Sequence, residues 1–346
     1  MCSETVVAII PANKGRDMGN RANFVIVENG EWQLYYSHWA GCRMLDALAF
    51  GPEFALRYVK ALEALPRTDW TCPLWSDGGA VIDVDRKRLL FFGDELMCDM
   101  PIRRAMFVVL IAMWPDYEVG WAYGGTHELA SYVGADCKWD DDLRGPDLKL
   151  ARKHGTGPCQ VVSMIDTAGH LRLWPLWWGV SSARHGSGLM ELLPGKGFAR
   201  LRLGQIPVGG VHIDAGRRRI GVWYTDEPQN VFHRLPHLWA GWQTECWDDR
   251  YEEHAARCGG ALRLPTLDLA EGVVSGRDWI HKRVFESFED SPAGAILRIA
   301  SLVSPLAPGL QVSAEAVTGA PARPTPAQWR RFEDACSRVS LYIESS

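Results

Sequence analysis

The sequence predicts an α+β protein: a tandem duplication of one antiparallel hairpin-plus-helix unit, followed by a mainly helical C-terminal extension. The main observation is a repeated stretch, because GGAVIDVDRKRLLFF at 78–92 and GGVHIDAGRRRIGVW at 209–223 are identical at six of fifteen positions. Two further pairs of segments match in the same order along the chain. Three ordered matches favour duplication over a coincidence between two ordinary hairpins, and hairpins alternating with helices are typical of the α+β class.

The first unit opens with a hairpin at 24–36. Apolar and polar residues alternate there on both sides of Asn29-Gly30, a pair that suits the positive φ angles of a tight turn. Two helices are expected over 45–62, because leucines and Val59 recur at helical spacing, with a break at Gly51-Pro52.

The rest of the first unit begins with the repeated stretch, which predicts strands at 80–84 and 89–92 joined by a charged turn. A helix follows at 101–113, with Pro101 suited to its first turn. A short strand at 118–123 and a short helix at 126–134, ending at Gly134, complete the unit.

The second unit repeats this order. A hairpin at 159–178 places Leu173 in the position of Leu34 and Trp178 in the position of Trp39, and a helix is expected near 189–194. After the second copy of the repeated stretch, the segment 240–259 corresponds to the end of the first unit, with Gly241-Trp242 aligned on Gly120-Trp121.

Three regions result: a first unit at 20–135, a second unit at 159–260, and a C-terminal extension at 262–346. The extension contains helical stretches, a Pro/Ala-rich linker, and a last helix that begins at Pro326 with Thr325 as its N-cap. In the two units, we expect Ile82 and Ile213 to be buried. The arginine- and lysine-rich turns at 86–88 and 217–219 are expected to be exposed.

The composition limits the classes of partner. The net charge of −5 argues against nucleic-acid binding, and the longest apolar run, near 105–114, is too short to span a membrane. The N-terminus lacks the pattern of a signal peptide, and nine cysteines without a CxxC motif suggest reduced thiols. We therefore expect a cytoplasmic protein that binds neither nucleic acid nor membrane.

No motif indicates a cofactor. The P-loop, GxSxG and HExxH patterns are absent. A metal-binding site is conceivable where five candidate ligands fall within 26 residues: His233, His237, Cys246, His254 and Cys258. His254 and Cys258 share one helix face, but the spacing forms no compact zinc finger. We therefore expect no metal and no cofactor.

A catalytic residue is suggested by His38, which lies between the first hairpin and a helix. It is a candidate general base, with Asp83 or Asp94 as the carboxylate that would orient it. His38 aligns with Trp177 in the second unit, so only the first unit would be catalytic. The alternative is that these hairpin ends are part of an aromatic core.

The sixteen tryptophans favour binding. Large aromatic side chains suit protein interfaces, and those at or beside matching positions are Trp39, Trp121, Trp177, Trp178 and Trp242. The expected function is an intracellular binding protein, of the inhibitor or immunity type, that recognises another protein; a small-molecule ligand is also open. The alternative is a hydrolase or transferase with a cleft between the two units. Trp39 and Trp178 are expected at the interface between the units.

Overall fold

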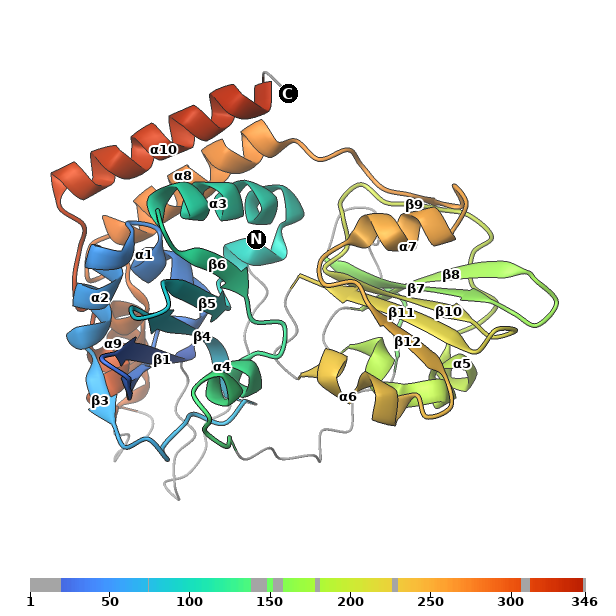
Figure 1. Cartoon of the computed structure of the whole chain (residues 1–346), viewed down its shortest axis with the longest axis horizontal. Coiled ribbons are helices and arrows are strands. Elements are labelled where there is room, and N and C mark those ends of the chain that lie inside the picture. The colour runs from blue at the N-terminus through green and yellow to red at the C-terminus, as the bar shows by residue number, and fades with distance from the viewer. Residues whose placement is uncertain are drawn as a thin grey trace.

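The computed structural model describes residues 20–73, 75–137, 148–151, 158–177, 181–225, 230–305 and 312–344. Two β-sheets lie side by side, each accompanied by helices (Figure 1). The long C-terminal helices α8 (Leu269–Val284) and α10 (Pro326–Glu344) lie over the first sheet and its helix α3 (Met100–Met113). Trp178, one of the tryptophans of the predicted binding set, lies outside the described residues.

The first sheet has the strand order β3-β2-β1-β4-β5-β6. Its strands are β1 (Arg21–Glu28), β2 (Glu31–Ser37), β3 (Glu63–Leu65), β4 (Ser76–Asp83), β5 (Arg88–Phe92) and β6 (Glu118–Trp121). Besides α3, its helices are η1 (Gly41–Arg43), α1 (Met44–Leu48), α2 (Pro52–Lys60), η2 (Glu95–Cys98) and α4 (Thr126–Tyr132).

The second sheet has the order β12-β11-β10-β7-β8. Its strands are β7 (Cys159–Ile165), β8 (Leu171–Trp177), β10 (Gly209–Asp214), β11 (Arg219–Tyr224) and β12 (Gln243–Cys246). Its helices are η3 (Ser182–Gly188), α5 (Leu189–Leu192), α6 (Val231–Leu238) and α7 (Tyr251–Arg257), and a small separate sheet pairs β9 (Leu201–Arg202) with β13 (Leu262–Arg263).

Both sheets are mixed, so the expectation of antiparallel sheets is wrong. In the first sheet β1 pairs with β4, and β5 with β6, in parallel; in the second sheet the pairs β7–β10 and β11–β12 are parallel in the same way. The hairpins within each sheet are antiparallel, as expected. Hairpin signals report only neighbouring strands, whereas a parallel pair arises from a helical crossover that the local pattern does not reveal.

The strand registers give a residue-by-residue correspondence between the sheets. Val25 pairs with both Leu34 and Val81, and Ser163 pairs with both Leu173 and His212. These registers agree with the alignment of 78–92 on 209–223 and of Leu34 on Leu173.

The third alignment is wrong by four residues. Phe91 pairs with Trp121, whereas the equivalent Val222 pairs with Cys246. Trp121 therefore corresponds to Cys246, and Trp242 precedes β12. The two Gly-Trp pairs look equivalent in the sequence, but the strand pairing shows that they occupy different positions in the two sheets.

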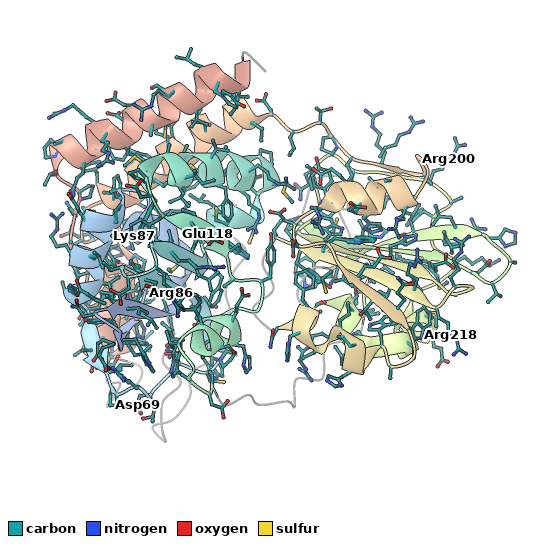
Figure 2. The ribbon with its side chains drawn as sticks, in the orientation of Figure 1. Asp69, Arg86, Lys87, Glu118, Arg200 and Arg218 are labelled. Carbon is teal, nitrogen blue, oxygen red and sulfur yellow. The ribbon has the colours of Figure 1, made fainter. Side chains whose placement is uncertain are left out.

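The repeated stretch folds as expected in both copies. Ile82 and Ile213 are completely buried, and the charged turns are exposed at their tips. Arg218, in the second turn, points away from its sheet (Figure 2). The last helix also begins as expected, because the Thr325 hydroxyl accepts a hydrogen bond from the Gln328 amide.

Two other helices also begin or divide as predicted. A break at Gly51, with φ of 86°, separates α1 from α2. Asp99 caps α3, and Pro101 lies in its first turn.

A buried arginine joins the two sheets. The Arg103 side chain, on α3, is completely buried and forms an ion pair of 2.7 Å with Asp249, which precedes α7. Its guanidinium lies 4.1 Å from the centre of the Trp121 ring. Tyr123 also reaches across, with its ring 5.6 Å from that of Phe232. Charge and aromatic contacts therefore set how the sheets pack together.

We predict that Ile82→Ala lowers the free energy of unfolding by about 2–4 kcal/mol, because it removes buried methylene and methyl groups and leaves a cavity. Arg86→Ala, in the exposed turn of the same hairpin, is the control and should change stability by less than about 0.5 kcal/mol. Urea unfolding measures both variants. Equal effects would contradict the burial of this strand face.

Candidate functional site

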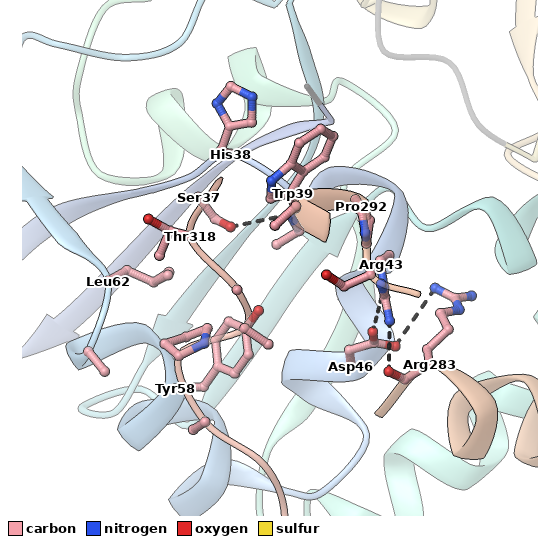
Figure 3. A pocket seen from close by; sticks show the side chains of 18 of the residues that line it. Ser37, His38, Trp39, Arg43, Asp46, Tyr58, Leu62, Arg283, Pro292 and Thr318 are labelled. Carbon is pink, nitrogen blue, oxygen red and sulfur yellow. Dashed lines mark hydrogen bonds and ion pairs between the residues drawn. The ribbon is translucent and has the colours of Figure 1, made fainter. Parts of the chain in front are cut away.

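A pocket lies between the first sheet and the C-terminal region. It encloses about 310 Å³, and its walls come from the end of β2, from α1 and α2, from the end of α8, and from the segment around 315–323. Figure 3 shows His38 and Trp39 on one side, Tyr58 and Leu62 on another, and Arg43, Asp46 and Arg283 at one end. The cleft that the sequence suggested was expected between the two units, so this pocket is in a different place.

His38 lies in the pocket wall among aromatic side chains. Its Nδ1 is 3.0 Å from the Tyr36 hydroxyl, and its ring lies 4.8 Å from that of Trp39. The side chain is almost completely buried. His38 therefore contacts aromatic side chains, as the alternative from the sequence expected, and the Glu315 carboxylate also lies near enough to interact with it; its role as a general base stays a prediction.

Asp83 and Asp94 serve other contacts. Asp83 accepts hydrogen bonds from the Arg86 amide and the Tyr132 hydroxyl, so it shapes the turn after β4. Asp94 holds Arg283 through bonds of 2.9 and 3.3 Å. Neither residue lines the pocket.

A network of charged side chains closes one end of the pocket. Arg43 forms ion pairs of 2.8 Å with Asp46 and 2.6 Å with Glu286. Arg283 pairs mainly with Asp94 and lies 3.8 Å from Asp46 Oδ1. That oxygen is buried and, among the described residues, accepts no hydrogen bond. The network thus contains a carboxylate oxygen that is incompletely satisfied.

Burial dominates the chemistry of Asp46. Desolvation raises the pKa of this carboxyl to about 6, against the opposing attraction of Arg283 and Arg43. A nearby carboxylate, Asp94, also raises it. Perturbed carboxylates in pocket walls are typical of functional sites. Nothing in the sequence singles out Asp46, because its helix pattern is ordinary and one of the two arginines beside it, Arg283, comes from the distant helix α8.

The four described tryptophans of the predicted binding set lie in four different surroundings. Trp39 donates a hydrogen bond to the carbonyl of Ala316, so it faces the C-terminal region; the expected position between the units is wrong for this residue. Trp121 is buried against Arg103. Trp177 is 56% exposed on β8, and Trp242 packs on Trp239.

The five metal candidates of the sequence analysis separate into two groups. His254 and Cys258 are buried and lie close together with His212, which the sequence analysis did not include. His233 and His237 belong to α6, and Cys246 is an exposed residue of β12 whose thiol donates to the Phe232 carbonyl. The sequence set therefore combines one real cluster with unrelated residues.

When the chain is compared with protein-family models, curated proteins and solved structures, nothing matches it. Within the described ranges, no helix combines the length and apolar character that crossing a lipid bilayer requires.

We predict that Asp46→Asn stabilises the protein at pH 8. The folded pKa of about 6 lies above the ordinary value of 3.8, so the folded state binds the extra proton and ionised Asp46 opposes folding above pH 6. The variant should gain up to about 2–3 kcal/mol at pH 8, and the gain should vanish as the pH falls to 4. Urea unfolding at several pH values measures this gain.

Asp85→Asn is the control for this experiment. Hydrogen bonds from the amides of Gly30 and Asn29 lower the pKa of the exposed Asp85 carboxyl, so the sign reverses. This variant should gain no stability at pH 8. An Asp46→Asn variant that loses stability at pH 8 would contradict the interpretation of Asp46.

Proposed function

We propose that this chain binds a small organic molecule in the pocket between the first sheet and the C-terminal region. A volume of about 310 Å³ is at the lower end of the range for ligand sites. Tyr36, Trp39 and Tyr58 offer aromatic surface for the body of such a ligand. The observation that carries the proposal is the buried Asp46 Oδ1, which lies 3.8 Å from Arg283 and accepts no hydrogen bond from the residues that the structure describes.

The charges around Asp46 favour an uncharged donor on the ligand. Arg43 and Arg283 already pair with this carboxylate, so its Oδ1 lacks a hydrogen-bond donor more than it lacks a counter-ion. A hydroxyl or amide N–H on the ligand can donate to the carboxylate without adding a charge beside the arginines, and satisfying a buried acceptor is favourable by about 1–3 kcal/mol. The proposed ligand therefore has an aromatic or aliphatic body and a neutral hydrogen-bond donor.

The ionised Asp46 carboxylate opposes folding, and this cost is consistent with a role in ligand binding. Groups placed for binding commonly reduce stability, and the usual result of replacing them is a more stable and less active protein. Asp46 has this property because its ionisation is unfavourable in the folded state.

A fragment library of neutral aromatic alcohols and amides tests the proposal by thermal shift and ligand-observed NMR at pH 7.5. We predict that hits lose at least about tenfold in affinity with Asp46→Asn or Trp39→Ala, which is the loss expected for one hydrogen bond or one aromatic contact. Trp177→Ala, an exposed tryptophan outside the pocket, is the matched control. Hits that bind all three variants equally would overturn the proposal.

A second candidate is recognition of another protein, as the composition suggested. The supporting observation is helix α9 (Pro292–Val303), whose apolar side chains at Leu297 and Leu302 are 42% and 74% exposed. A photo-crosslinking amino acid in place of Leu302 should form a discrete adduct in a cell extract. The same group in place of Arg86, in an exposed charged turn, should not. Equal labelling from both positions would count against a protein partner.

We also infer that the chain arose by tandem duplication of the unit at 20–135. Two mixed sheets with five strands in the same order and the same directions support this history. On this view 159–260 is the second copy and 262–346 is an addition that packs on the first. A cytoplasmic location remains part of the proposal, on the basis of the cysteine pattern.

A further inference from the structure

Four polar side chains meet between the second sheet and helix α7. The Ser163 hydroxyl lies 2.8 Å from Nδ1 of His212 and 2.7 Å from Nε2 of His254. The Cys258 thiol, at the end of α7, also lies near enough to Ser163 to interact with it. One ligand atom from each of His212, His254 and Cys258 lies within 4.8 Å of the others, and all three residues are buried.

The first sheet fills the same positions with apolar side chains. The strand registers equate Val25 with Ser163 and Val81 with His212. Helix α4 corresponds to α7, since β6 and β12 have equivalent registers and both helices have seven residues.

This correspondence equates Leu129 with His254 and Val133 with Cys258. Two glycines confirm the first equivalence, because a Cβ on Gly79 would meet Leu129 and a Cβ on the equivalent Gly210 would meet His254. The contact between sheet and helix is therefore apolar in the first sheet, with α4, and contains the polar cluster in the second sheet, with α7.

The apolar version shows that packing alone does not need the polar groups. In the first sheet Val25, Val81 and Leu129 are completely or almost completely buried and form part of one core. Burying a polar group in place of an apolar one is unfavourable unless its hydrogen bonds are satisfied, and it adds no packing advantage. Hydrogen bonds among Ser163, His212, His254 and Trp223 offset that cost, but packing alone does not explain why two imidazoles, a thiol and a hydroxyl meet at these positions.

Both imidazoles are available as neutral ligands at neutral pH. Burial lowers the pKa of His212 to about 4, and the positive charge of Arg257 lowers it further in the same direction. Burial also lowers the pKa of His254 to about 3, with a smaller contribution from the neighbouring His212. Burial raises the pKa of the Cys258 thiol, so this sulfur is protonated until a cation displaces the proton.

We propose that Ser163, His212, His254 and Cys258 form a binding site for a thiophilic divalent cation, of which Zn²⁺ is the representative. Tetrahedral zinc with nitrogen and sulfur ligands needs donors about 3.3–3.7 Å apart, so these side chains need to move by about 1 Å or less. Ser163 or a water molecule supplies the fourth ligand. This proposal reverses the expectation of no metal, because His212 completes a set that spacing alone did not reveal.

Binding requires two proton movements. The Cys258 thiol releases its proton to solvent as the sulfur–metal bond forms. In the metal-free protein, His254 Nδ1 accepts a hydrogen bond of 3.1 Å from the Trp223 indole, so Nε2 carries the ring proton. Coordination through Nε2 moves this proton to Nδ1 and ends the bond from Trp223. Loss of one hydrogen bond is small beside the free energy that zinc coordination by nitrogen and sulfur ligands supplies.

The experiment offers Zn²⁺ to the folded protein and during refolding, because the donors are buried. Elemental analysis after removal of free metal should give about one zinc per chain. Co²⁺ under the same conditions should produce a thiolate-to-cobalt charge-transfer band. Proton movement at His254 should also shift the indole N–H resonance of Trp223 when zinc binds.

Substitution with the first-sheet residues provides the decisive variant. A chain carrying Ser163→Val, His212→Val, His254→Leu, Cys258→Val and Trp223→Phe reproduces an apolar contact that the first sheet already contains, and it should fold without taking up zinc. Cys258→Ser, a minimal change, should remove the charge-transfer band even if the five-fold variant does not fold. His233→Ala with His237→Ala is the control and should keep about one zinc per chain.

Three results would overturn the proposal. The first is wild-type protein that takes up no zinc after refolding. The second is a Cys258→Ser variant that keeps the charge-transfer band. The third is loss of zinc from the His233 and His237 control, which would place the metal at α6.

Discussion

The pocket depends on the buried ion pair between Asp94 and Arg283, whose side chains are 0% and 6% exposed. Asp94 follows β5 with φ of 79°, and its carboxylate also accepts hydrogen bonds from the amides of Leu45 and Leu96. One carboxylate therefore fixes the start of α1, the start of η2 and the end of α8. Removing one partner of such a pair is unfavourable by about 3–5 kcal/mol, since the remaining charge stays buried. Helix α8 can form a wall of the pocket because this pair holds it against the first sheet.

The same pair explains the state of Asp46. Arg283 directs its two terminal nitrogens to Asp94. Among the described residues, Asp46 therefore forms a short ion pair with Arg43 alone, and Arg43 also pairs with Glu286. Two arginines thus serve three carboxylates, and at Asp46 burial outweighs their attraction and raises the pKa of the carboxyl. A ligand that donates to Asp46 would complete the network. This links the stability of the C-terminal region to the chemistry of the pocket.

Local signals in the sequence predicted local structure well. The Asn-Gly turn, Gly51-Pro52, the cap at Thr325 and the buried isoleucines of the repeated stretch are all confirmed, because each depends on neighbouring residues. Contacts between distant segments were not predictable in this way. The parallel strand pairs need crossovers, the pocket joins residues near 40 to residues near 320, and His212 meets His254 from another strand. Aligning Trp121 on Trp242 also concealed the equivalence of Leu129 and His254.

The two sheets use one arrangement of strands for different ends. In the first sheet the contact with α4 is apolar, and the polar chemistry lies outside it, where the C-terminal helices add a wall. In the second sheet the polar groups lie inside the contact with α7, and Trp223 replaces Phe92 beside them. Phe92 needs no polar partner, whereas a buried indole N–H does, and His254 supplies the acceptor. The exchange of Phe for Trp and of Leu for His therefore belongs to a single change in chemistry, which a comparison of isolated positions would not reveal.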